Sequence, residues 1–164
     1  MNIVLVGFMG AGKTTVGRRL AARLGYRFID VDCCIEQEQG CPISEIFHYA
    51  DEKYFRRLET DFIKRLQNLS NVIVSTGGGI LTTEGNLELL HRIGKIFYLK
   101  TDLEETFARI KKSTNRPLLN VENPKEKMVA LFKSREHFYQ EADITIETTA
   151  KNIYQITNEI IHAL

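Results

Sequence analysis

The chain has 164 residues, a formal net charge of +1, 43% hydrophobic residues and 26% charged residues. This length fits one domain with its own core, and the composition is that of a globular protein rather than a disordered one. A net charge so close to zero gives no general basic field for nucleic acid, and no apolar run approaches the ~20 residues of a membrane span.

Short runs of β-branched and aromatic residues alternate along the chain with longer helical patterns. Because these runs are continuously apolar, they predict strands that are buried on both faces of a sheet. Strands that alternate with helices are typical of βαβ units, so the sequence predicts an α/β fold with a parallel sheet between helices. The predicted strands are residues 2–6, 27–30, 71–75, 95–100 and 143–147.

Helices are predicted where apolar residues recur at helical spacing or where a start signal occurs. Asp102 with Glu105 resembles a capping box, and Pro124 after Asn123 suits a first helical position. Residues 111–123 have no periodicity, and a connection of this length is either disordered or a working loop. The predicted helices cover residues 13–24, 51–69 and 152–164, and two more begin near Asp102 and Pro124.

Residues 7–14 read Gly-Phe-Met-Gly-Ala-Gly-Lys-Thr and match the phosphate-loop pattern G-x-x-x-x-G-K-[ST] in full. A predicted strand precedes them and a predicted helix follows, so a plain glycine-rich turn is the weaker alternative. Glycines let backbone N–H groups approach phosphates, and the helix N-terminus adds a positive dipole end. Lys13 would then bridge the β- and γ-phosphates of ATP, and the Thr14 hydroxyl would ligate Mg²⁺. The predicted nucleotide contacts here are Gly10, Ala11, Gly12, Lys13, Thr14 and Thr15.

Asp30 and Asp32 stand where the second predicted strand ends. Alternation along a strand would point both carboxylates the same way, at the sheet edge where ligands bind in open α/β folds. One carboxylate can hold Mg²⁺ through water, while the other contacts an acceptor hydroxyl and takes its proton. The alternative for either residue is an aspartate that caps a helix starting at Cys33.

Two further motifs are ambiguous when each is taken alone. Arg56 and Glu59 lie on one helical face, and the simpler interpretation is a surface ion pair worth under about 1 kcal/mol. The alternative is a carboxylate that orients a guanidinium for binding a substrate acid. Thr76 and three glycines follow the third predicted strand, which indicates either close approach of another group to the backbone or a tight turn.

Taken together, these motifs resemble the shikimate kinase family, a branch of the P-loop proteins with a nucleoside-monophosphate-kinase-like fold. The resemblance covers essentially the whole chain, and the order and spacing of the motifs make coincidence improbable. It is carried by residues 7–14, Asp30-Val31-Asp32, Phe55-Arg56-Arg57-Leu58-Glu59, residues 75–79, Arg116-Pro117-Leu118-Leu119 and Arg135.

The resemblance implies a three-layer fold with a five-stranded parallel sheet of order 2-3-1-4-5. It implies one domain over residues 1–164, with a substrate-binding region at about 32–62 and a lid at about 111–123. The implied activity is transfer of the ATP γ-phosphate to the 3-hydroxyl of shikimate, with Mg²⁺, in aromatic amino acid (chorismate) biosynthesis.

The resemblance also implies residue roles. Asp32 would bind the shikimate hydroxyls and act in catalysis with Lys13 and Arg116, the last carried by the lid. Thr14 and Asp30 would serve the metal ion. Arg109 would pack on adenine, and Arg116 would also contact the nucleotide. The shikimate contacts would be Asp32, Arg56, Gly77, Gly78, Gly79 and Arg135, with Glu59 holding Arg56.

One departure from the family pattern concerns the segment after Arg135. Family members often have proline two residues later, whereas this chain has His137, which we expect to be an exposed helix residue. The pattern resumes at Tyr139.

Two alternative functions share the phosphate loop. A gluconate kinase or nucleoside monophosphate kinase would differ in its acceptor residues, and a regulatory nucleotide-binding module should lack one of the residues needed for turnover.

The three cysteines are an odd number that includes an adjacent pair, which suits free thiols in a reducing cytoplasm. We expect a cytoplasmic protein that is a monomer and binds neither nucleic acid nor membrane.

Overall fold

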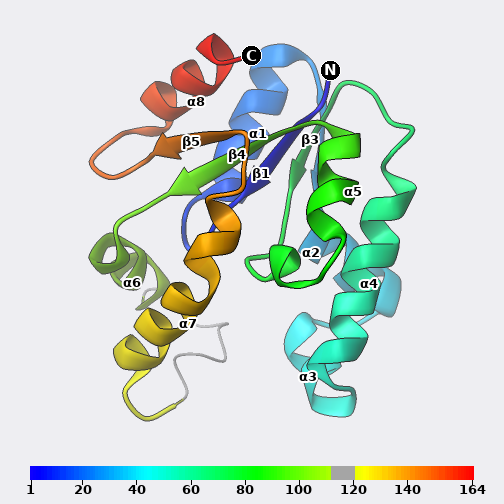
Figure 1. Ribbon diagram of the computed structural model, residues 1–164, viewed down its shortest axis with the longest axis vertical. Coiled ribbons are helices and arrows are strands. Elements are labelled where there is room, and N and C mark those ends of the chain that lie inside the picture. Colours follow the sequence, from blue (N-terminus) through cyan, green and yellow to red (C-terminus); the bar gives the residue numbers. More distant parts are fainter. Residues whose placement is uncertain (112–120) are drawn as a thin grey trace.

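The computed structural model describes residues 1–111 and 121–164. In this part of the chain five parallel strands form one sheet in the order β2-β3-β1-β4-β5, with helices packed against it (Figure 1). The predicted fold class and strand order are therefore confirmed. The strands are β1 (Ile3–Val6), β2 (Arg27–Asp30), β3 (Val72–Ser75), β4 (Lys95–Lys100) and β5 (Ile144–Glu147).

The helices are more numerous than the sequence predicts. The segments without a prediction are short, so few apolar repeats mark them, and residues 51–69 give a helix that ends at Arg65. Pro124 is the first helical residue as predicted. The described helices are α1 (Lys13–Leu24), α2 (Val31–Gln39), α3 (Ile43–Tyr49), α4 (Glu52–Arg65), α5 (Asn86–Ile93), α6 (Leu103–Lys111), α7 (Pro124–Tyr139) and α8 (Ile153–His162), with a 3-10 turn η1 (Ile80–Thr82).

Side-chain hydrogen bonds explain where several helices begin. Asp51 accepts a bond from the Tyr54 amide ahead of α4, and Asn152 forms a complete capping box with Gln155 ahead of α8. Asp102 accepts bonds from the amides of residues 104 and 105 at the start of α6, but only this half of the predicted capping box forms, because the Asp102 amide donates to Thr149 instead of Glu105. No helix among residues 1–111 and 121–164 is both long enough and apolar enough to cross a membrane.

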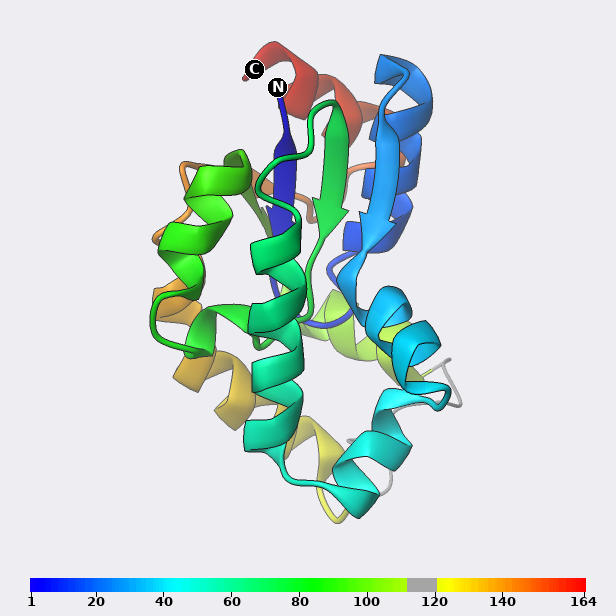
Figure 2. The same ribbon diagram turned by 90° about the vertical axis from the view of Figure 1, so that its right-hand side faces the viewer.

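The sheet divides the hydrophobic core into two layers, and the side chains of its central strand β1 alternate between them. Ile3 and Leu5 pack with α1 and α8 on one face, whereas Val4 and Val6 pack with α4, α5 and α7 on the other (Figure 2). All four side chains are fully buried, as expected for a strand covered on both faces. Because the strands are parallel, their carboxyl ends meet at one edge, where the loops that carry the predicted site residues converge.

Candidate active site

A cavity of about 1540 Å³ opens at the carboxyl edge of the sheet. A pocket for one small ligand typically measures ~300–1,000 Å³, so this cavity has room for two adjoining ligands. Its wall joins the phosphate loop to residues of α2, α3, α4, α6 and α7. The cavity therefore brings the predicted nucleotide and acceptor residues into one continuous space.

The phosphate loop has the backbone geometry that its glycines allow. Gly10 and Gly12 have φ angles of 76° and 89°, in the left-handed region that side chains disfavour. The Lys13 Nζ donates to the carbonyl oxygens of Gly7 at 2.7 Å and Phe8 at 3.0 Å, beneath the loop. The ammonium group is thus held against the main chain at the start of the loop.

The start of α1 favours an anion. Gly12 occupies the N-cap without a side chain to cap the first amides, and the first turn contains no acidic residue. The positive end of the helix dipole consequently faces the loop uncompensated by carboxylates of that turn. Arg109 of α6 donates to the Gly10 carbonyl at 3.2 Å and pairs with Glu105, so it borders the same end of the cavity.

Thr14, the last residue of the phosphate loop, and Asp30 bring together two oxygen atoms that could ligate a metal ion. The Thr14 hydroxyl donates to Asp30 Oδ2 at 2.7 Å. Within the described ranges no group of three or more His, Cys, Asp or Glu residues could enclose a metal ion. Hydroxyl and carboxylate oxygens nevertheless suit Mg²⁺, which commonly takes few protein ligands and keeps water and phosphate oxygens. These residues fit a metal ion that arrives with a nucleotide.

The alternation argument for Asp30 and Asp32 is wrong, although both residues line the cavity. The strand ends at Asp30, which caps α2 by accepting a bond from the Cys33 amide at 3.3 Å. Asp32 lies in the first helical turn instead of the strand. Its Oδ1 is buried without a hydrogen-bond partner in the described part of the chain. Burial raises the pKa of Asp32 above its usual value, although the nearby Lys13 ammonium opposes the shift.

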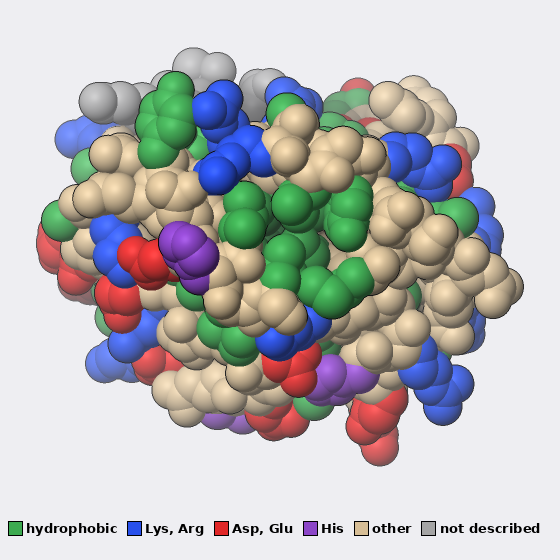
Figure 3. All heavy atoms as spheres, turned by 90° about the horizontal axis from the view of Figure 1, so that it is seen from above, with side chains coloured by type: hydrophobic (Ala, Val, Ile, Leu, Met, Phe, Trp, Pro, Cys, Tyr) green, Lys and Arg blue, Asp and Glu red, His purple; other side chains and the backbone are tan. Residues whose placement is uncertain are grey.

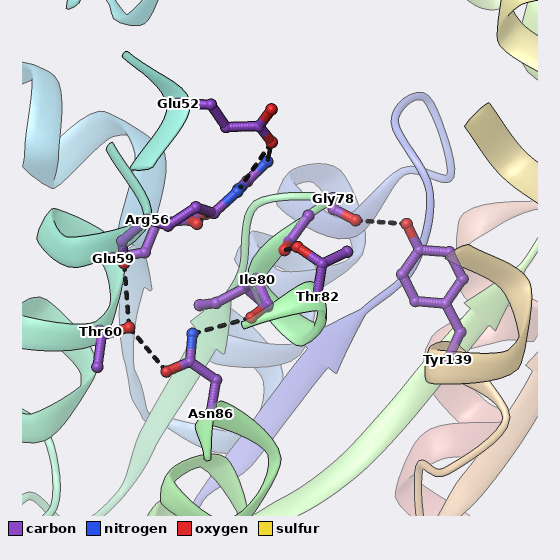
Figure 4. Close-up of polar contacts among 10 residues, drawn as sticks. Glu52, Arg56, Glu59, Thr60, Gly78, Ile80, Thr82, Asn86 and Tyr139 are labelled. Carbon is purple, nitrogen blue, oxygen red and sulfur yellow. Dashed lines mark hydrogen bonds and ion pairs between the residues drawn. The ribbon is translucent and has the colours of Figure 1, made fainter. Parts of the chain in front are cut away.

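The Arg56–Glu59 pair is not the surface ion pair that the sequence alone favours. The Glu59 side chain is fully buried and that of Arg56 is 14% exposed, with 2.6 Å between Arg56 Nη1 and Glu59 Oε2 (Figure 4). Glu52 also accepts from Arg56, at 2.9 Å from Nη2. Burial raises the pKa of Glu59 to about 7, against the effect of the guanidinium. The pair holds a cation at the cavity wall.

Glu59 should make the stability of the chain fall as the pH rises. Its pKa of about 7 in the folded chain lies above the usual 4.5, so the folded state binds more protons between these values. The stability that protonated Glu59 contributes is therefore fully present below 4.5 and is lost as the pH rises through 7. Glu59→Gln should flatten this dependence of the free energy of unfolding, by up to about 3 kcal/mol. Urea unfolding across this range tests the prediction, and a variant curve parallel to wild type would contradict it.

Two of the three glycines after β3, Gly77 and Gly79, leave no room for a side chain, whereas a Cβ on Gly78 would make only ordinary contacts. A Cβ on Gly77 would come within 2.7 Å of Asp32 Oδ1, and one on Gly79 within 2.3 Å of Arg56 Nη2. None of residues 77–79 has a left-handed φ angle. The backbone here is thus packed directly against the carboxylate and the guanidinium of the predicted acceptor site.

Arg135 of α7 completes the cationic part of the wall. Its Nη1 would lie 3.8 Å from a Cβ on Gly78, and it lines the cavity with Arg56. His137 is exposed on the same helix, as expected. Arg116 lies outside the described residues.

Some cavity residues escaped the sequence analysis. Phe47 and His48 lie on α3, a helix of only seven residues for which no periodic pattern was found. Glu52, in the first turn of α4, contacts Arg56 four residues on, a spacing at which helical side chains meet. That spacing is a signal by which Glu52 could have been found.

A phosphate loop at the carboxyl edge of a 2-3-1-4-5 sheet, open to a second pocket lined by arginines, defines a small P-loop phosphotransferase. A sequence profile described as shikimate kinase matches residues 9–164. The chain belongs to the shikimate kinase family, and as a member it is an ATP-dependent kinase. The resemblance inferred from the motifs is confirmed.

Individual relatives agree with this assignment. The chain is 47% identical over 160 residues to a shikimate kinase of Persephonella marina, covering 98% of this chain and 96% of the relative. A structure of shikimate kinase from Acinetobacter baumannii in complex with shikimate superposes with a TM-score of 0.93 at 42% identity, covering 99% of this chain and 91% of that one. A gluconokinase from Sinorhizobium meliloti, at 16% identity with 98% and 89% of the two chains covered and a TM-score of 0.60, shares the fold alone.

Proposed function

We propose that this chain transfers the γ-phosphoryl group of ATP to the 3-hydroxyl of shikimate, giving shikimate 3-phosphate and ADP in aromatic amino acid biosynthesis. The observation that carries the proposal is a continuous cavity that connects the phosphate loop with Arg56, a half-buried arginine oriented by a buried carboxyl group. The related Acinetobacter baumannii enzyme, which resembles this chain closely, was solved with shikimate bound.

Arg56 and Arg135 would bind the carboxylate of the acceptor. Charge-assisted hydrogen bonds to a carboxylate are the strong kind, and the forked guanidinium matches the two oxygens of the acid. Glu59 fixes the orientation of Arg56, and the small glycines let the acceptor ring approach the backbone at residues 77–79. The acid would bind where the two guanidinium groups line the cavity.

Asp32 would take the proton of the attacking hydroxyl. As that oxygen bonds to the γ-phosphorus, the bond from phosphorus to the β–γ bridging oxygen breaks and ADP leaves with the electron pair. A raised pKa makes the buried Asp32 carboxylate a better proton acceptor than an ordinary aspartate. Lys13 would contact the β- and γ-phosphates throughout this transfer.

Thr14 and Asp30 are the residues that would hold Mg²⁺, Asp30 through a water molecule. When bound, Mg²⁺ would neutralise charge on the phosphate oxygens. The remaining nucleotide contacts in the proposal are the loop residues 10–15, Arg109 beside adenine, and Arg116. Arg116 would stabilise the transferring group from the lid proposed at about 111–123, and a closed lid would exclude water that otherwise hydrolyses ATP.

We further infer that residues 1–164 form one domain, with the substrate-binding region at about 32–62. We also infer that the protein is a cytoplasmic monomer that binds neither nucleic acid nor membrane. Cys33, Cys34 and Cys41 are free thiols, which suits a reducing compartment. On the face that carries both chain ends, hydrophobic side chains gather near the centre with charges of both signs around them (Figure 3). Because such an apolar group could also mediate association, sedimentation measurements should test the monomer.

An assay of ADP release with ATP, Mg²⁺ and a panel of acceptors tests the activity. Shikimate should be turned over, whereas gluconate and nucleoside monophosphates should not. Rapid turnover of either alternative in place of shikimate would overturn the assignment. Nucleotide binding without transfer to any acceptor would instead favour a regulatory module.

A further inference from the structure

The main-chain carbonyl groups of residues 77–80, which follow β3, all accept hydrogen bonds. The Gly77 carbonyl accepts from the Ile80 amide at 3.3 Å, and the Gly79 carbonyl accepts from the Thr82 hydroxyl at 2.7 Å. Two further carbonyls, those of Gly78 and Ile80, accept from side chains of other helices (Figure 4). The segment that lines the acceptor site is therefore tied to α7 on one side and to α5 on the other.

Tyr139 of α7 makes the first of these two bonds, which joins residues far apart in the sequence. Its hydroxyl donates to the Gly78 carbonyl, and the side chain is buried. Burial raises the pKa of Tyr139 to about 12, so the hydroxyl remains a donor at neutral pH. Because the C=O and N–H of a trans peptide point in opposite directions, this bond also fixes where the Gly79 N–H points. Tyr139 is one helical turn after Arg135, so one helix carries both groups.

Asn86 makes the second of these bonds, to a carbonyl six residues earlier, and a further bond connects it to α4. Its Nδ2 donates to the Ile80 carbonyl at 2.8 Å, and its Oδ1 accepts from the Thr60 hydroxyl at 2.8 Å. Asn86 is fully buried, and both ends of its amide are used. Thr60 lies one turn after Arg56 and its hydroxyl is also 3.0 Å from the Arg56 carbonyl. One side chain thus joins the glycine segment to the helix that carries Arg56 and Glu59.

The glycine segment, residues 77–79, has little room to move relative to α4 and α7. A Cβ on Gly79 would come within 2.3 Å of Arg56 Nη2, so the backbone already lies against the guanidinium. A shift of α4 or α7 relative to the glycine segment would change the spacing of the two arginines from the backbone between them. Small misplacements of binding groups have large effects in such sites.

We propose that Tyr139, Asn86 and Thr60 are positioning residues, which hold the glycine segment between α4 and α7 so that Arg56, Arg135 and the backbone fit one acceptor. This inference rests on the proposed function and extends it to residues behind the cavity wall. None of the three residues is among those that line the cavity. They act on the acceptor through the elements they connect and not by touching it.

Steady-state kinetics of Tyr139→Phe and Thr60→Val test the proposal, since each variant removes a hydroxyl with little change in volume. The loss of one hydrogen bond should raise the KM for shikimate about two- to tenfold. The KM for ATP should stay within about twofold of wild type, because the phosphate loop is held by other contacts. Thr60→Ser keeps the hydroxyl and should restore the wild-type KM for shikimate.

Tyr98→Phe is the matched control for Tyr139→Phe. The Tyr98 ring stacks on Tyr139 with centroids 5.2 Å apart, and its buried hydroxyl has no hydrogen-bond partner within the described residues. Removing that hydroxyl should leave both KM values unchanged. It should also increase the free energy of unfolding, because a buried polar group without a partner is unfavourable.

The outcomes separate the inference from the proposed function. If wild type phosphorylates shikimate and Tyr139→Phe and Thr60→Val leave its KM unchanged, the positioning role is overturned alone. Parallel increases in the KM for ATP and shikimate would overturn it too, since they indicate a general structural role. A wild-type chain that phosphorylates no shikimate overturns the proposed function and this inference with it.

Discussion

Replacement of Lys13 by alanine is expected to lower kcat by about 10²–10³-fold or more while the chain stays folded. Lys13 as a whole residue is only 9% exposed, and its ammonium group donates to the Gly7 and Phe8 carbonyls of the phosphate loop. Phosphoryl transfer depends on positioning and on neutralising charge at the phosphates, so the loss falls on the transition state. Steady-state and single-turnover measurements with ATP and shikimate test this prediction.

Lys95→Ala provides a control for Lys13→Ala. Lys95 also donates to a main-chain carbonyl, that of Ala163 at 2.6 Å, but it does not line the cavity. Its replacement should leave kcat unchanged. If Lys13→Ala retained wild-type kcat, or if both lysine variants lost activity equally, Lys13 would have no special part in the transfer.

Replacement of Arg56 by alanine is expected to raise the KM for shikimate about 10- to 150-fold, since hydrogen bonds to charged groups contribute about 1.5–3 kcal/mol. Arg135→Ala should act in the same direction. The Arg56 variant should also lose stability, because it leaves Glu59 buried without its guanidinium partner. The pKa of Glu59 should then rise further, so the loss should grow as the pH increases.

Arg65→Ala is the matched control on the same helix. Arg65 pairs with Glu38 at 2.8 Å, and its side chain is 57% exposed. Such a surface pair contributes under about 1 kcal/mol, and its removal should leave the KM for shikimate unchanged. If Arg56→Ala behaved like Arg65→Ala, Arg56 would have no role in acceptor binding despite its burial.

The fold was predictable because its signals are local. The continuous apolar runs gave the strands to within one residue at each start, and Asp51, Asp102 and Pro124 marked helix starts that the structure contains. Short helices such as α3 and α5 escaped because two turns show too little periodicity. The strand order came from the family resemblance, because pairing between distant segments leaves no signal in their own residues.

The phosphate loop was determined by the sequence alone, since its geometry arises within eight consecutive residues and the helix that follows them. The acceptor site was decided by tertiary structure. Glu59 is fully buried, so Arg56 and Glu59 are not the surface ion pair that their spacing suggests, and Glu59 orients the Arg56 guanidinium. Asp32 reaches the cavity because helix α2 begins at Val31, and not because Asp32 continues the strand. Burial and the contacts of distant segments depend on how helices pack against the sheet, and no single stretch of sequence contains that information.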